Sequence, residues 1–278
     1  MSGTLYVVAT PIGNLEDITL RALRILQQVD LIAAEDTRHS RKLLNHFAIT
    51  TTMVAFHEHN ERDKTATLIE QLRGGKSIAL ISDAGTPTIA DPGYRLISAV
   101  RAAGLPVAAV PGPSAIIAAL SVAGLPTDSF QFLGFLPAKA SARGKVLEGL
   151  RGEQRTTVCY ETPHRLLKAV TDIHDILGPE CEVVVVRELT KIHEEVVRGP
   201  VREVLAEFSA REKVRGEIVL LLGAVPVVVS ADNWRERLRE RLAAGAETPK
   251  QSVKFIAKEF GVPSDDVYRY ALALRNDE

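Results

Sequence analysis

The stretch "SDAGTPTIADPG" (residues 82–93) follows the apolar run "SIALI" (77–81) and places two glycines, two prolines and two aspartates within twelve positions. A short apolar run bounded by turn residues predicts a buried strand. A simple connection needs only a few turn residues, so a long polar loop at the carboxyl end of a strand favours a ligand-binding loop. An ordinary surface loop is the alternative that this stretch alone leaves open.

The same alternation of apolar runs and helical patterns extends on both sides of this loop. The apolar runs are "TLYVVAT", "LIAAED", "TMVAFH", "SIALIS" and "VAAV", and helices are expected at residues 17–28, 37–46, 61–73, 93–103 and 114–122. This succession predicts a parallel sheet with helices on both faces. Ligands bind such sheets beyond the carboxyl ends of the strands, where the loops "TPIGNLED", "EDTRHS", "HEHNE" and "PGPSA" also fall.

The rhythm changes at residues 123–145, which are rich in Gly, Pro and polar residues. We therefore expect an N-terminal α/β domain at 1–124 and a second α/β domain at 125–226. The run from "VVVVRELT" to "HEEVVRG" predicts a hairpin, so the second sheet should be mixed. It is accompanied by strands at "SFQFLGFL", "TTVCYET" and "GEIVLLLG" and by helices ending near 150 and spanning 164–177 and 201–208.

Residues 227–278 are expected to form a linker and a helix-turn-helix-like tail. Thr248 can cap one helix, and the turn at 261–264 leads into the next. From residue 230 onward nine Lys/Arg face nine Asp/Glu, so charge gives no support to nucleic-acid binding by the tail. A packing hairpin is the alternative.

Composition narrows the class of protein. The chain has 278 residues, 46% of them hydrophobic, and a formal net charge of −1, which favours two globular domains and gives no bulk attraction to nucleic acid. No apolar run is long enough for a membrane span and the start has no signal-peptide pattern, so we expect a cytoplasmic protein with no membrane contact. Cys159 and Cys181 are expected to be buried thiols.

Several common site motifs are absent. The first loop, "ATPIGNLED", has one Gly and no G-x-G-x-x-G pattern, and no phosphate-binding P-loop occurs. His57 and His59 of "FHEHNE" do not have the spacing of H-E-x-x-H, so we expect a solvated loop and no metal. In "PGPSA", Ser114 lies at a helix N-terminus that favours an anionic group. Together with Asp83 this favours a zwitterionic ligand, although a capped helix start explains "PGPSA" equally well.

A family resemblance adds to these inferences. The motifs "VATPIGNLEDIT", "AEDTRHS", "SDAGTPTIADPG", "PGPSA", "FLGFLP", "YETPHR", "RELTKIHEE" and "GEIVLLLG" occur in this order over residues 4–223. The chain resembles the tetrapyrrole-methylase-like (class III) S-adenosylmethionine methyltransferases. The resemblance implies two α/β domains with a small C-terminal helical extension, S-adenosylmethionine bound between the domains, and a homodimer. The sulfonium methyl group of this donor needs no metal activation, so no metal is expected.

The resemblance also implies which residues bind the donor: Ile12, Asp83, Thr86, Ser114, Ala115, Thr162, Pro163, Leu189, Glu217 and Ile218. Tetrapyrrole-modifying members usually carry a Gly-x-Gly first loop, whereas "TPIGN" is the pattern of the RNA-modifying branch. For that branch the resemblance implies 2′-O-methylation of a cytidine ribose in the decoding region of 16S ribosomal RNA, with the small subunit as partner. A small-molecule, tetrapyrrole-type methyltransferase is the alternative.

The catalytic residues are less determined by the sequence. Methyl transfer from a sulfonium requires an aligned hydroxyl and a route for its proton. We expect Asp36 or Glu188 as the base and Lys191 or Arg38 as a cationic orienting group. A structural salt-bridge network explains the same residues equally well. The segment 137–155, with five Lys/Arg against two Glu, can contact phosphates together with "RHSRK" (38–42), or form a solvated linker.

Overall fold

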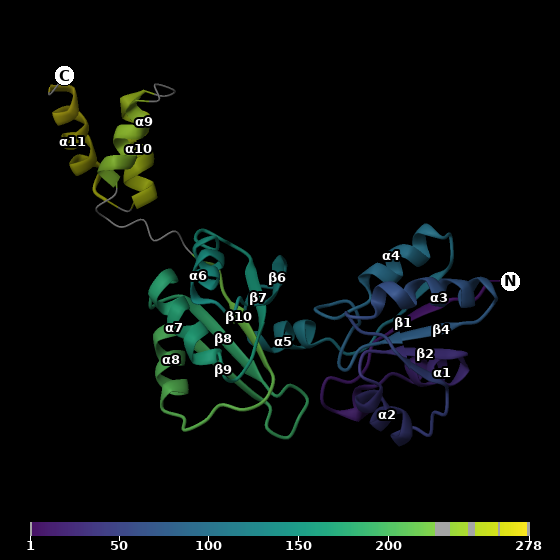
Figure 1. Cartoon of the computed structure of the whole chain (residues 1–278). Coiled ribbons are helices and arrows are strands. Elements are labelled where there is room, and N and C mark those ends of the chain that lie inside the picture. Colours follow the sequence, from purple (N-terminus) through teal and green to yellow (C-terminus); the bar gives the residue numbers. More distant parts are fainter. Residues whose placement is uncertain (1, 226–233, 244–247, 261, 277–278) are drawn as a thin grey trace. The chain divides into compact units, whose positions relative to one another are not determined.

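The computed structural model of the chain describes residues 2–225, 234–243, 248–260 and 262–276 (Figure 1). The chain forms two compact units, residues 1–225 and 226–278. The first unit contains two five-stranded sheets, and the described part of the second consists of helices. Within the described ranges, no helix combines the length and the apolar character that crossing a bilayer requires.

The first sheet is entirely parallel, as the sequence predicts. Its strands are β1 (Leu5–Val8), β2 (Leu31–Ala34), β3 (Met53–Ala55), β4 (Ile78–Ile81) and β5 (Val107–Val110), in the order β3-β2-β4-β1-β5. All four residues of β2 and of β4 are buried, which explains why these strands are continuous apolar runs. The carboxyl ends of all five strands therefore lie at one edge, where the polar loops begin.

Helices cover both faces of this sheet (Figure 1). One face packs against α1 (Leu20–Gln28) and α2 (Thr37–His46), and the other against α3 (Glu61–Arg73) and α4 (Tyr94–Ala102). The predicted helix start at Asp17 is wrong. Residues Leu15–Asp17 form a separate 3-10 turn, η1, and Thr19 caps α1 by accepting the Ala22 N–H at 3.1 Å.

The second sheet is mixed, and the predicted hairpin is confirmed. Its strands are β6 (Phe130–Phe135), β7 (Thr156–Glu161), β8 (Glu182–Arg187), β9 (Glu195–Pro200) and β10 (Ile218–Leu222), in the order β6-β7-β10-β8-β9. Only β6 and β7 pair in parallel. The helices α6 (Ala140–Glu148), α7 (Leu166–Leu177) and α8 (Val201–Ser209) pack on one face. The predicted start of α7 at His164 is two residues early.

Helix α5 (Ala115–Ala123) covers the other face of the second sheet although it follows β5 of the first. Its buried residues Ile116, Ala119 and Leu120 belong to one apolar cluster with Val184 and Val219. The chain therefore passes from the first sheet to the second at the start of α5, next to Ser114. The domain boundary near Leu125 stays a prediction.

The second unit contains α9 (Trp234–Ala243), α10 (Pro249–Phe260) and α11 (Ser264–Asn276). Their apolar cluster includes Trp234, Ile256 and Val267. The expected helical pair is present as α10 and α11, and the Gln251 side chain accepts the Thr248 N–H at 3.0 Å at the start of α10. Most of the predicted linker, and Gly261 of the predicted turn, lie outside the described residues.

Candidate functional site

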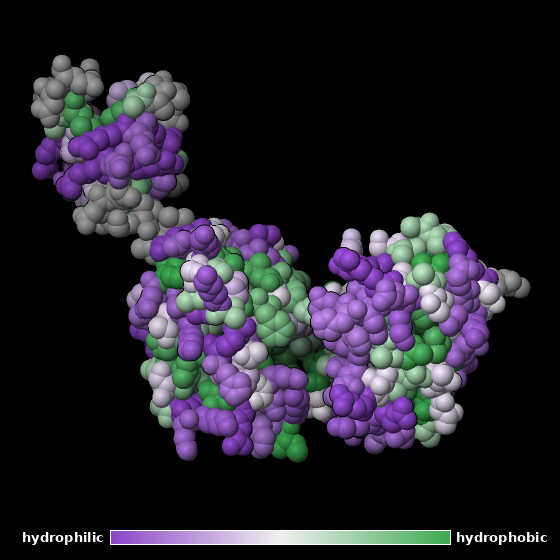
Figure 2. Space-filling model, viewed as in Figure 1, coloured by the Kyte–Doolittle hydropathy of each residue, from purple (hydrophilic) through white to green (hydrophobic). Residues whose placement is uncertain are grey.

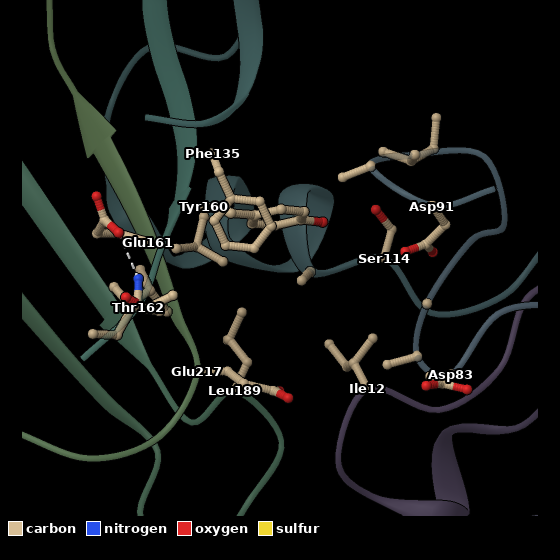
Figure 3. A pocket seen from close by; sticks show the side chains of 18 of the residues that line it. Ile12, Asp83, Asp91, Ser114, Phe135, Tyr160, Glu161, Thr162, Leu189 and Glu217 are labelled. Carbon is tan, nitrogen blue, oxygen red and sulfur yellow. Dashed lines mark hydrogen bonds between the residues drawn. The ribbon is translucent and has the colours of Figure 1, made fainter. Parts of the chain in front are cut away.

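A cavity of about 340 Å³ lies within residues 1–225 (Figure 3). This volume is in the range of small-molecule sites. Loops after the strands of the first sheet supply one wall, and the second sheet with its loops supplies the other. Its lining residues include Ile12, Glu35, Asp83, Thr86, Asp91, Ser114, Ala115, Phe135, Tyr160, Glu161, Thr162, Pro163, Leu189, Glu217 and Ile218.

The loop at residues 82–93 is held in place by backbone bonds to the first strand's exit. Thr10 and Gly85 exchange two hydrogen bonds, with N···O distances of 2.9 and 3.0 Å. The Thr86 hydroxyl donates to the Pro113 carbonyl at 3.2 Å, which ties this loop to the segment before α5. Thr88 and Ala90 have left-handed φ values of 77° and 66°. Such strain is characteristic of ligand-binding loops whose shape the surrounding structure enforces.

The far end of this loop is anchored by Glu61, which is 5% exposed. Its carboxylate oxygen Oε1 accepts the N–H groups of Gly93, Arg95 and Leu96 at 3.1–3.4 Å. The carboxylate thus satisfies N–H groups at the start of α4 that the helix itself leaves unpaired. Glu61 fixes the position at which the loop ends.

The "FHEHNE" motif positions this glutamate. The Asn60 side chain accepts the His57 N–H at 2.9 Å and donates to the Ala55 carbonyl at 3.2 Å, which shapes the turn into α3. Among the described residues, no group of three or more His, Cys, Asp or Glu side chains is arranged to hold a metal ion. The two bonds of the Asn60 side chain give the motif a structural role at the start of α3.

The wall from the first sheet carries three carboxylates: Glu35, Asp83 and Asp91. Asp83 Oδ1 accepts the Asp36 N–H at 3.0 Å. Burial raises the pKa of Glu35, and repulsion from Asp91 and Asp83 raises it further. Burial likewise raises the pKa of Asp91, with a contribution from Asp83. In the part of the chain that the structure describes, none of the three forms an ion pair.

The opposite wall is aromatic. The rings of Phe135 and Tyr160 have centroids 5.4 Å apart, and Figure 3 shows both side chains beside the cavity. Burial raises the pKa of Tyr160 to about 12, with contributions from Asp91 and Glu217. The phenol is therefore neutral at physiological pH, and this wall provides an apolar surface with one hydroxyl.

The second wall has two acidic residues, Glu161 and Glu217, and each forms an ion pair, unlike the carboxylates of the first wall. Glu161 is buried, lies 3.2 Å from the Arg165 guanidinium and accepts the Thr162 N–H at 2.7 Å (Figure 3, dashed line). Burial raises the pKa of Glu161, while the Thr162 N–H and Arg165 oppose the shift. Arg165 also donates to the Leu136 carbonyl. The pair fixes the turn that presents Thr162 and Pro163.

Lys191 links two carboxylates, Glu188 and Glu217, at the rim of the cavity. Its Nζ lies 2.8 Å from Glu188 Oε1 and 3.1 Å from Glu217 Oε2, and Glu188 also accepts the Glu217 N–H at 3.0 Å. The bond from Lys191 lowers the pKa of Glu188. Glu188 has a left-handed φ of 54°. A side chain at Gly216, where φ is 91°, would collide with the Glu188 carboxylate, so this rim requires glycine there.

The first turn of α5 reaches the cavity. Ser114 is the residue before the helix, its side chain makes no capping bond, and both Ser114 and Ala115 line the cavity. The first N–H groups of a helix lack partners within the helix and favour an anionic group. This end of the cavity therefore favours a negative group, whereas the end with the three carboxylates favours a positive one.

All ten residues predicted to bind the donor line this one cavity, and none of the four predicted catalytic residues is among its lining. Asp36 caps α2 by accepting the Arg38 N–H at 2.7 Å, while the Arg38 side chain is 92% exposed. The backbone N–H of Arg38 lowers the pKa of Asp36. The sequence also offers Glu161 of "YETPHR" as a rim residue, and it lines the cavity. Lining residues that lie within the quoted motifs but were not singled out from the sequence include Glu35, Asp91, Phe135 and Tyr160.

Comparison with known proteins identifies the family. The model of the tetrapyrrole (corrin/porphyrin) methylases matches residues 4–205. Ribosomal RNA small subunit methyltransferase I of Escherichia coli O157:H7 is 48% identical over 97% of this chain and 95% of its own length. The protein of the same name from Synechocystis is 46% identical over 99% of both chains.

A solved structure has the same fold. Uroporphyrin-III C-methyl transferase from Thermus thermophilus, complexed with S-adenyl homocysteine, has a TM-score of 0.55 and 19% identity, covering 80% of this chain and 98% of its own. This likeness and the family match confirm the predicted fold class. The chain belongs to the tetrapyrrole (corrin/porphyrin) methylase family.

Proposed function

We propose that this chain transfers a methyl group from S-adenosylmethionine to the 2′-hydroxyl of a cytidine ribose in the decoding region of 16S ribosomal RNA. The observation that carries the proposal is one cavity that gathers all ten motif residues expected to bind the donor. The choice of ribosomal RNA as the methyl acceptor rests on the names of two relatives, which refer to the small-subunit RNA and are 46% and 48% identical to this chain over nearly its full length.

The cavity suits the chemistry of this donor. S-adenosylmethionine carries a positive sulfonium and a zwitterionic amino-acid group. Glu35, Asp83 and Asp91 supply negative charge without a competing cation, and the start of α5 supplies N–H groups for a carboxylate. Phe135 and Tyr160 supply a flat apolar surface for an adenine ring. The solved structure of uroporphyrin-III C-methyl transferase contains S-adenyl homocysteine, which is what remains of this donor after it loses its methyl group.

Positioning is the main task of the chain's residues. The donor supplies an activated methyl group, so the protein must hold a ribose hydroxyl in line with it and exclude competing water. Asp36 and Glu188 stay candidates for the base, but hydrogen bonds lower the pKa of both, which weakens them as proton acceptors. Arg38 and Lys191 stay candidates for the orienting cation. Of these two, Arg38 is the more exposed to an approaching substrate.

The proposal includes three further parts, of which the first two are implied by the family resemblance and the third is expected from the sequence. The acceptor is presented by the small ribosomal subunit, the active form is a homodimer, and the enzyme acts in the cytoplasm. No metal is part of the proposed reaction, because a sulfonium methyl needs no Lewis acid.

The test is a transfer assay with radiolabelled S-adenosylmethionine. The acceptors are small ribosomal subunits from cells that lack this enzyme and, separately, tetrapyrrole precursors. We expect label on the ribose of one cytidine of the subunit RNA and none on the tetrapyrroles. Label on a tetrapyrrole, or binding of the donor without label on either acceptor, contradicts the proposed substrate.

A further inference from the structure

Helix α2 (Thr37–His46) has an exposed basic face. Arg38, Arg41 and Lys42 are exposed, as are His39 and His46, whereas the inward positions are Ser40, Leu43 and Leu44. Residues three and four apart lie on the same face of a helix, so Arg38, Arg41 and Lys42 form one group. The helix itself contains no Asp or Glu. Over α2, the surface drawn in Figure 2 is mostly hydrophilic.

The charges of this face are largely unneutralised. Arg38 lies 3.6 Å from Asp36, and both side chains are solvent-exposed, which makes this a weak pair. Within the described ranges, the side chains of Arg41 and Lys42 form no hydrogen bond or ion pair. Some other surface cations are neutralised by a neighbour, as Arg73 is by Glu70 at 2.6 Å.

The basic face begins at the rim of the cavity. Asp36, which caps α2, donates its N–H to Asp83 of the cavity wall at 3.0 Å, and the preceding residue Glu35 lines the cavity. The cavity lining contains five carboxylates and no Lys, Arg or His. Two of these carboxylates, Glu161 and Glu217, are paired with cations. The other three lie on the wall next to α2, so a phosphate group is repelled from that wall and attracted to α2 immediately outside it.

The other basic segment of the sequence is weaker in the folded chain. In residues 137–155, Arg143 is buried and bound to Asp172 at 2.6 Å, and Arg155 is bound to Glu153 at 2.7 Å. Lys139, Lys145 and Arg151 stay exposed, but Glu148 is exposed among them. Of these five cations, Arg143 is thus buried in an ion pair, and the exposed Arg155 is paired with Glu153.

We infer that the face of α2 formed by Arg38, Arg41 and Lys42 binds the phosphodiester backbone of the ribosomal RNA next to the target nucleotide. This inference rests on the proposed function and adds its RNA-contact surface. The acidic cavity receives the cationic donor, and the adjacent helix holds the anionic acceptor. Phosphate contacts of this kind position a substrate without reading its sequence.

The test uses the full chain with Arg41→Ala and Lys42→Ala combined, leaving Arg38 in place because it is also a catalytic candidate. With small subunits as acceptor, we expect KM to rise about tenfold and kcat to change little, because each lost phosphate contact weakens binding without touching the reacting atoms. The dependence of RNA binding on salt should weaken by about 1.4 units in log–log slope, the loss expected for two contacts to single-stranded RNA.

Three controls separate charge from structure. A variant with Lys168→Ala and Lys213→Ala loses the same charge at two exposed positions, one in α7 and one before β10, and should keep the normal KM. Arg41→Lys keeps the charge and should keep the normal KM. Calorimetry with S-adenosylmethionine should give the same donor affinity for all variants, since none of these residues lines the cavity.

The possible outcomes are distinct. A normal KM and salt slope in the Arg41→Ala, Lys42→Ala variant overturn the inference while leaving the proposed function intact. The same holds if a variant of Lys139, Lys145 and Arg151 to Ala, and not the α2 variant, raises KM. If the wild-type chain neither binds nor methylates subunits, the proposed function fails and the inference falls with it.

Discussion

The two walls of the cavity use carboxylates in opposite ways. On the first sheet's side, Glu35, Asp83 and Asp91 have no ion-pair partner within the described residues, and burial raises the pKa of Glu35 and Asp91. On the second sheet's side, Glu161 is paired with Arg165 and Glu217 with Lys191. Unpaired charge in a cavity is costly to the fold and useful to a ligand of opposite charge. Paired charge holds the shape of the wall.

This difference predicts that neutralising a residue of the second wall damages stability, whereas neutralising one of the first wall damages binding of a cationic ligand. The experiments below separate the two effects. Each measures the free energy of unfolding by chemical denaturation and donor affinity by calorimetry.

The largest effect is expected for Glu161→Ala. This change leaves the Arg165 guanidinium without its carboxylate in a half-buried position, and breaking such a pair costs about 3 kcal/mol of unfolding free energy. The matched control is Glu182→Ala, which removes an exposed pair with Arg198 in the same sheet and should cost less than about 1 kcal/mol. Equal losses for the two variants would argue against a structural role for the Glu161 pair.

Glu61→Ala should cost about 2 kcal/mol, because three N–H groups at the start of α4 lose their acceptor. Donor affinity should fall as well, since Gly93 ends the loop that carries Asp83 and Asp91. Glu61→Gln keeps an acceptor oxygen and should lose less than half as much stability. If Glu61→Ala unfolds as easily as expected but binds the donor normally, the anchor does not shape the first wall.

Asp83→Asn should weaken donor binding about tenfold, or about 1.4 kcal/mol, with little loss of stability. The amide oxygen can still accept the Asp36 N–H, so the change removes charge more than structure. Asp63→Asn, an exposed position in α3, is the control. A fall in stability without a change in affinity would place Asp83 with the paired residues of the second wall.

The smallest effect is the pH dependence. Glu35 and Asp91 attract a cation only when ionised, and their pKa values are raised, so donor affinity should fall on acidification at a higher pH than ordinary carboxyl groups would give. Fold stability should change in the opposite sense. A carboxyl with a raised folded-state pKa binds its proton more tightly in the fold, so stability falls as pH rises from the unfolded to the folded pKa.

Comparing wild type with the Glu35→Gln, Asp91→Asn variant over this pH range checks both signs. Thermal melts and donor titrations of the variant should lack the part of each pH dependence that the two carboxyls contribute. A wild-type donor affinity that is constant through this range would exclude an electrostatic role for them.

The sequence predicted the alternation of strands and helices well, because each element carries its own hydrophobic period. Helices α2 and α3 begin and end at the predicted residues. The start of α1 differs from the expected one at Asp17. Glu16 and Asp17 are acidic residues of the kind found in a first helical turn, but the Asn14 side chain holds them in the separate turn η1, and Thr19 caps α1 instead. Such local competition is decided by side-chain bonds to the backbone.

The site was predicted by motif but not always by residue. In "AEDTRHS" the sequence favoured Asp36, yet Asp36 turns to cap α2 and its neighbour Glu35 lines the cavity. In "RELTKIHEE" the sequence favoured Glu188, but its carboxylate accepts bonds from Lys191 and the Glu217 N–H, and the residue does not line the cavity. Its left-handed φ of 54° is not visible in the sequence pattern. The anchoring of α4 by Glu61 joins residues more than thirty positions apart, and no local pattern contains that information.

The most direct test of this account compares S-adenosylmethionine with S-adenosylhomocysteine, which lacks the positive sulfonium, by calorimetry on wild type and on an Asp83→Asn, Asp91→Asn variant. If the unpaired wall holds a cationic donor, neutralising both carboxylates weakens S-adenosylmethionine binding about tenfold more than it weakens S-adenosylhomocysteine binding. Equal weakening of the two ligands, or no weakening of either, would contradict the account.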